Sequence, residues 1–98
     1  MDQRVLDAQK WLNITYGNND NYSIIQENGK TGNVVMEALV TALQIELEMS
    51  NITGYFGSQT TSAYNQNIVK YGDSDSYNNI IRILQHALYC KGYNPTAV

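Results

Sequence analysis

The stretch Asn28–Leu39, NGKTGNVVMEAL, has a counterpart 25 residues further along the chain, Thr53–Tyr64, TGYFGSQTTSAY. Each stretch carries a Gly-x-x-Gly followed after five residues by an alanine; the glycines are Gly29, Gly32, Gly54 and Gly57. Glycine permits positive φ angles and close backbone approach. We therefore expect two tight structural turns, each leading into a helix of one small bundle.

Helical spacing of apolar residues extends outward from these turns over segments 4–17, 33–50, 59 onward and 79–95. The segment 33–50 is apolar around most of its surface, which predicts a central helix that contacts two neighbours. No segment shows a convincing strand pattern. The expected fold is all-α, a three-helix bundle with a fourth, C-terminal helix.

Gln9 lies inside the apolar stripe formed by Val5, Ala8 and Leu12 in the first segment. A buried amide without partners costs roughly 1–3 kcal/mol, so we expect Gln9 to hold a loop in place. The loop available is 17–32, which is rich in glycine, asparagine and aspartate. Trp11 falls on the flank of the same stripe.

The last helical segment repeats the first. VLDAQKWL at 5–12 is matched by IRILQHAL at 81–88, with Gln85 in the place of Gln9. A second apolar stripe lies roughly opposite, at Ile80, Ile83, Ala87 and Cys90. One stripe could cover the rest of the chain and leave the other for a partner.

An ordered set of residues within 4–65 carries a family resemblance: Val5, Gln9, Leu12 and Gly17; the turn Asn28-Gly29-Lys30-Thr31-Gly32; Ala38, Leu39, Leu43 and Gln44; the turn Gly54-Tyr55-Phe56-Gly57; Thr60 and Ala63. In this order and spacing they resemble the peptidoglycan-binding type 1 module. That module is a small three-helix domain attached to bacterial and phage cell-wall hydrolases. The resemblance implies a module at 1–70, and at 71–98 a linker and helix similar to the start of a second, truncated copy.

The resemblance also implies a function. The chain would be a non-catalytic module that binds peptidoglycan, by glycan strand or stem peptide, and brings an attached wall hydrolase, such as an endolysin or autolysin, to its substrate. A glycoside-hydrolase-like or other hydrolase domain would follow it, and it would work in the cell wall, outside the cell. The ligand groove would lie by the glycine turns, with these candidate residues: Lys30, Thr31, Tyr55, Gln59, Tyr64 and, as an extra platform, Trp11.

Charge and hydropathy exclude several other partners. The net charge is −3 and the pI about 4.8, with no run of lysine or arginine, so neither nucleic acid nor an anionic membrane surface is expected. No apolar run is long enough to span a membrane. The first residues lack the pattern of a signal peptide, so a wall location implies a fragment or phage-type export.

Catalytic chemistry is not expected. His86 and Cys90 lie one helical turn apart, but a structural zinc site needs four ligands and the chain has no other histidine or cysteine. One histidine also cannot build a nucleophilic triad with this context. We therefore expect no metal, no cofactor and no enzyme activity in this chain.

The alternative is a helical interaction domain that packs on its own enzyme or forms dimers. It would use the second stripe of the last helix, at Ile80, Ile83 and Ala87.

Overall fold

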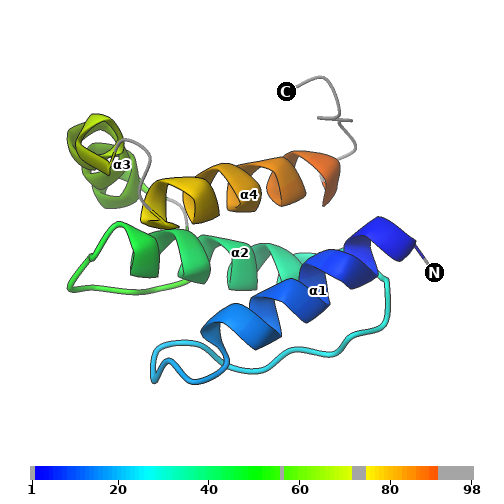
Figure 1. Ribbon diagram of the computed structural model, residues 1–98. Coiled ribbons are helices and arrows are strands. Elements are labelled where there is room, and N and C mark those ends of the chain that lie inside the picture. The colour runs from blue at the N-terminus through cyan, green and yellow to red at the C-terminus, as the bar shows by residue number, and fades with distance from the viewer. Residues whose placement is uncertain (1, 56, 72–74, 91–98) are drawn as a thin grey trace.

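The structure is a computed structural model that describes residues 2–55, 57–71 and 75–90, without the side chains of 64, 66–71 and 75–77 (Figure 1). Its helices are α1 (Gln3–Tyr16), α2 (Asn33–Glu46), α3 (Ser58–Tyr71) and α4 (Asp75–Cys90). The described residues contain no strand, which confirms the all-α prediction. None of the helices in the described part of the chain has the length and apolarity needed to cross a membrane.

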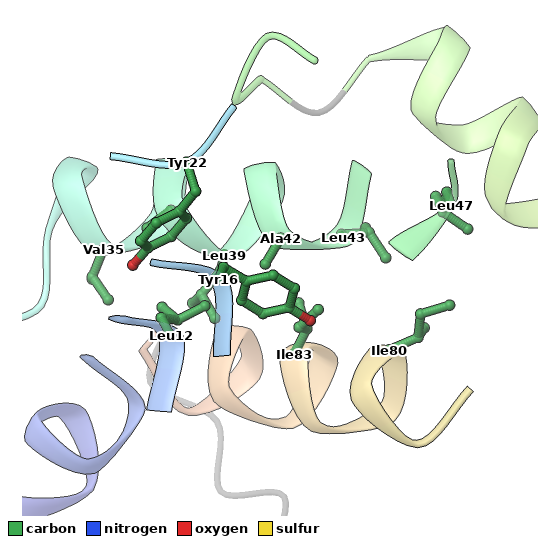
Figure 2. Packing of buried hydrophobic residues seen from close by; sticks show 11 residues of the cluster. Leu12, Tyr16, Tyr22, Val35, Leu39, Ala42, Leu43, Leu47, Ile80 and Ile83 are labelled. Carbon is green, nitrogen blue, oxygen red and sulfur yellow. The ribbon is translucent and has the colours of Figure 1, made fainter. Parts of the chain in front are cut away.

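Helix α2 is the centre of the bundle. It lies between α1 and α4 and packs against both, while α3 sits near one end of α2 and α4 with its axis turned across theirs (Figure 1). The prediction of a central helix is confirmed. Side chains from α1, α2, α4 and the first loop share one core (Figure 2): Leu12, Tyr16, Tyr22, Val35, Ala38, Leu39, Ala42, Leu43, Leu47, Ile80 and Ile83.

Helix α4 turns its second stripe inward. Ile80 and Ile83 are 0% and 2% exposed and belong to the common core, and Ala87 is half-buried against it. The expectation that this stripe forms a dimer surface is therefore wrong about the residues, because a single chain already covers them. On the first stripe, Leu88 is 44% exposed. The core continues across the expected boundary between 70 and 71.

Helix α2 ends at Glu46, four residues before the end expected from its apolar pattern. Glu48 adopts the left-handed conformation with φ 57°. Its N–H donates to the Ile45 carbonyl, and the Met49 N–H donates to the Gln44 carbonyl. These two bonds form a Schellman motif, which stops the helix although Leu47 and Met49 continue the apolar stripe.

Two buried glutamines hold the two glycine turns. The Gln9 Oε1 accepts from the N–H groups of Asn28 and Gly29, and its Nε2 donates to Asn28 Oδ1 and the Lys30 carbonyl. The prediction that Gln9 ties down a loop is confirmed. We call residues 28–32 turn 1.

Gln44 does the same for the second glycine turn, whose described residues, 53–55 and 57, we call turn 2. Its Oε1 accepts from the N–H groups of Thr53 and Gly54, and its Nε2 donates to the Tyr55 carbonyl and the hydroxyls of Thr53 and Thr60. Sequence reasoning missed this role. The available signal was its position after Leu43 and before Leu47, which matches that of Gln9 after Ala8 and before Leu12.

The first glycine of each turn has an equivalent conformation. Gly29 has φ 69° and Gly54 has φ 77°, and each donates its N–H to the glutamine below it at 2.8 and 3.0 Å. The repeated Gly-x-x-Gly pattern thus reflects two copies of one glutamine–turn arrangement.

The far end of α4 joins the start of α1 and turn 1. The Tyr89 hydroxyl donates to Asp2 Oδ2 at 2.8 Å, and the Thr31 hydroxyl donates to the Cys90 carbonyl at 3.3 Å. The Asp2 N–H donates to the Gly29 carbonyl, and Asp2 also caps α1 through the N–H groups of Arg4 and Val5. Both ends of the described chain therefore lie beside turn 1.

Replacing Gln44 by alanine should lower the free energy of unfolding by about 2–4 kcal/mol, because two main-chain N–H groups lose their buried acceptor. The measurement is urea denaturation followed by circular dichroism. Gln3→Ala is the matched control, since Gln3 bonds Asp7 on the exposed surface, and it should cost under about 0.5 kcal/mol. Equal effects of the two variants would contradict the role given to Gln44.

Gly54→Ala should destabilise the chain by about 1–2 kcal/mol, because a left-handed φ is unfavourable for alanine and the added Cβ would lie 3.2 Å from the Thr41 hydroxyl. Gly57→Ala is the control, since a Cβ there would meet nothing within 4 Å. Thermal denaturation of both variants tests this, and a Gly57 variant as unstable as the Gly54 variant would refute it.

Candidate functional site

A row of hollows runs along the side of α2 from turn 1 to turn 2 and continues to the first residues of α3. It consists of four adjoining hollows, of which the largest measures about 410 Å³. Neighbouring hollows, counted from turn 1, share lining residues. Gln26 and Val34 line both the first and the second hollow, and Thr53 lines both the second and the third. Ser58 and Gln59 are among the residues that line both the third and the fourth. We call this row of adjoining hollows the α2 groove.

The middle of the α2 groove lies between a loop and a helix. Residues 21–26 form one side, the α2 residues Val34, Glu37, Ala38 and Thr41 form the other, and Thr53 and Gly54 of turn 2 complete it. The close approach of Gly54 to Thr41 and Glu37 brings turn 2 onto α2. The turn conformation set by Gln44 therefore shapes one end of this hollow.

Asn13 of α1 fixes the loop side of the groove. Its Nδ2 donates to the Ile25 carbonyl at 2.8 Å, and its Oδ1 accepts from the Ile25 N–H at 3.0 Å and the Tyr22 hydroxyl at 2.8 Å. Burial and the nearby Glu27 carboxylate raise the pKa of Tyr22 to about 12, so its hydroxyl remains a donor at neutral pH. The loop is thus held by hydrogen bonds to Asn13 as well as by the burial of the Tyr22 ring in the common core.

Exposed apolar side chains follow the groove. Ile24, Val34 and Tyr55 are 64%, 64% and 68% exposed, and all three line it. Its charged lining residues are Lys30 at the turn 1 end and Glu37 in the middle. The remaining lining groups are mostly amides, hydroxyls and main chain, a mixture that suits a polar polymer with small apolar groups.

The structure separates the candidate residues into two ends of this groove. Lys30 and Thr31 line the turn 1 end, and Tyr55 and Gln59 line the turn 2 end. Contrary to the expectation from the sequence, these residues do not gather in one pocket. The side chain of Tyr64 lies outside the described residues.

Trp11 lies away from the α2 groove, on a patch formed with Arg82 and His86 of α4. The Arg82 guanidinium carbon is 4.8 Å from the centre of the indole, and the imidazole centre is 5.6 Å from it. Tyr16 meets the same indole edge-on at 5.7 Å. Trp11 is half-buried, as its flank position predicts, and the α4 side chains around it could not be placed there from sequence alone.

Comparison with known proteins places the chain in a family. The sequence model of the FadG/YbfG, PGDB-like domain matches residues 2–88. The chain belongs to this family. PGDB here means peptidoglycan-binding-like. This corrects the resemblance drawn from the sequence, because the matching family is not the peptidoglycan-binding type 1 family itself. The match also includes most of α4.

Two relatives come from Bacillus subtilis (strain 168). The uncharacterized protein FadG is 44% identical over 95 residues, which is 97% of this chain and 16% of that protein. The uncharacterized protein YbfG is 40% identical over 95 residues, 97% of this chain and 13% of that protein. The chain therefore spans a small part of the relatives it matches. No solved structure gives a significant match.

The Trp11 patch should respond to pH. Burial, followed by the positive charges of Arg82 and Arg4, holds the pKa of His86 below its ordinary value, against a smaller opposing effect of Asp7. Fluorescence of Trp11, the single tryptophan, should change with a midpoint below pH 6.5. Because the folded-state pKa is lowered, the stability contribution is complete above pH 6.5 and is lost as the pH falls through that midpoint.

His86→Gln should abolish this fluorescence transition while leaving the fold intact by circular dichroism. A transition in the unsubstituted chain at or above pH 6.5 would contradict the arrangement.

Proposed function

We propose that the chain is a non-catalytic module that binds peptidoglycan along the α2 groove. The observation that carries the proposal is the row of adjoining hollows along α2 between two turns of equivalent build. An open groove suits a long flexible polymer better than it suits a small ligand, which is usually enclosed in a pocket. The peptidoglycan-binding-like description of the family agrees with this ligand.

The chemistry of the groove supports the same ligand. Peptidoglycan offers amides, hydroxyls, carboxylates and small apolar groups. The groove offers the Tyr55 ring, the Gln59 amide and the Lys30 ammonium at its two ends. Tyrosine combines an apolar ring with a hydrogen-bonding tip, which makes Tyr55 the strongest single candidate for contact with a sugar or an acetamido group.

The role of the module would be to concentrate an attached wall-active domain on its substrate. A tethered domain acts at an effective concentration set by the linker, so even a weak module raises the rate of attack on a polymer. The much greater length of FadG and YbfG leaves room for such a domain. A glycoside-hydrolase-like domain is the proposed partner, and the wall is the proposed location.

A docking surface for the attached domain is the second candidate. The Trp11 patch favours it, because tryptophan and arginine are the residue types enriched at the energetic centres of interfaces. In that case the chain would position its enzyme instead of holding the wall. Retention on purified sacculi separates the two functions.

Purified sacculi should retain the 98-residue chain in a sedimentation assay. Tyr55→Ala should weaken retention about tenfold, the loss of one central aromatic contact, without lowering the melting temperature. Ile14→Ala is the matched control, because Ile14 is 82% exposed and lies outside the groove; it should bind like the unsubstituted chain. No retention of the unsubstituted chain would refute wall binding and favour the docking function.

A further inference from the structure

The loop that forms one side of the α2 groove has two main-chain edges. On one edge the main-chain groups are hydrogen-bonded, and on the other, which we call the open edge, they have no hydrogen-bond partner among the described residues. Ile25 uses both of its main-chain groups toward α1, where the Asn13 amide pairs with them as a neighbouring strand would. Among the described residues, no hydrogen bond engages the main-chain groups of Ser23, Ile24 or Gln26. The segment 22–27 contains neither helix nor turn, and the loop runs alongside α1 in Figure 1.

In an extended segment, the main-chain groups of successive residues point to opposite edges. Both main-chain groups of Ile25 bond to Asn13 on α1, so in an extended backbone the N–H and C=O groups of Ile24 and Gln26 face the opposite edge, away from α1. These residues line the middle hollow. The open edge is thus available to a chain that enters the groove between the loop and α2.

We infer that the α2 groove recognises an extended peptide, the stem peptide of peptidoglycan, which pairs with the open edge at Ile24 and Gln26 as an added strand. This inference rests on the proposed function and selects one component of the polymer. Strand addition supplies affinity through main-chain bonds, and pockets for side chains supply selectivity. Here Ile24 and Val34 contact small apolar side chains, such as those of alanine.

The charges fit a peptide that carries both signs. Glu37 in the middle of the groove pairs with an amine, and Lys30 at the turn 1 end pairs with a carboxylate. A neutral glycan strand offers neither partner. Aliphatic side chains also dominate the exposed apolar surface of the middle hollow, whereas the exposed ring of Tyr55 lines only the turn 2 end. Sugar faces prefer aromatic rings, so the middle hollow suits a peptide better.

The first experiment compares two forms of the wall with the 98-residue chain. Glycan strands freed of their stem peptides by an amidase lose the peptide cross-links, so they are coupled to beads for this assay. They should retain at least tenfold less chain than intact sacculi coupled to the same beads, and released stem peptides should compete for binding. Equal retention by the bead-coupled glycan strands would overturn the peptide inference and leave wall binding in place. Retention by neither form would overturn both.

The second experiment tests the main-chain pairing. Gln26→Pro removes one N–H from the open edge and preserves the bonds of Ile25, so it should weaken stem-peptide binding about three- to tenfold. Gln26→Ala is the matched control, because both variants lose the side-chain bond to Asn28 and only alanine keeps the N–H. Equal affinity of the two folded variants would overturn the inference.

The unsubstituted chain gives an independent readout if the proline variant does not fold. On addition of stem peptide, the amide protons of Ile24 and Gln26 should shift in NMR spectra and exchange more slowly with solvent. The amide of Ile25, already bonded to Asn13, should keep its exchange rate within about twofold. Unchanged exchange at Ile24 and Gln26 in the bound state would overturn the inference.

Discussion

The fold depends on two side-chain amides that replace main-chain pairing. Gln9 and Gln44 each extend from a helix into a glycine turn and satisfy both donors and acceptors there. Without them, turns pressed against helices would bury unpaired polar groups, and each such group costs about 1–3 kcal/mol. A chain of 98 residues has little apolar surface with which to offset that cost. The turns are therefore positioned by hydrogen bonds, and the apolar core is left to join the helices.

The groove is a by-product of the same solution. The first loop passes along α1 and is held there at Ile25 by Asn13 and at turn 1 by Gln9. Beyond the Tyr22 ring, which packs into the common core, a hollow remains between the loop and α2. Turn 2 closes that space near Gly54, where the absence of a side chain lets the backbone approach Thr41. A side-chain amide holds each of these two sides, that of Asn13 at the loop and that of Gln44 at turn 2.

Much of this architecture could be predicted from sequence. The apolar periods located the helices, the broad apolar arc of α2 identified the central one, and the polar residue in an apolar stripe identified Gln9 as a loop anchor. The end of α2 could not be predicted, because the apolar pattern continues through Leu47 and Met49 while Glu48 takes a left-handed conformation that any local rule disfavours. The inward stripe of α4 was assigned wrongly for a related reason. Two opposite apolar stripes are indistinguishable until the neighbouring helices are in place.

The candidate site was less accessible to prediction than the fold. Residue types near the glycine turns indicated Lys30, Thr31, Tyr55 and Gln59, but their distribution over two ends depends on how α2 separates the turns. The open edge at Ile24 and Gln26 has no signature in residue type, since it consists of main-chain groups. It becomes visible only when the partners of Ile25 are known.

The joining of α4 to Asp2 and turn 1 has a consequence for tether geometry. The chain enters the described region at Asp2 and leaves it at Cys90, and hydrogen bonds hold these two places together. A domain connected at either point would start from the Lys30 end of the groove, and Tyr55 lines a different hollow, beside turn 2. The chain therefore enters and leaves the described region at neighbouring points, both beside turn 1.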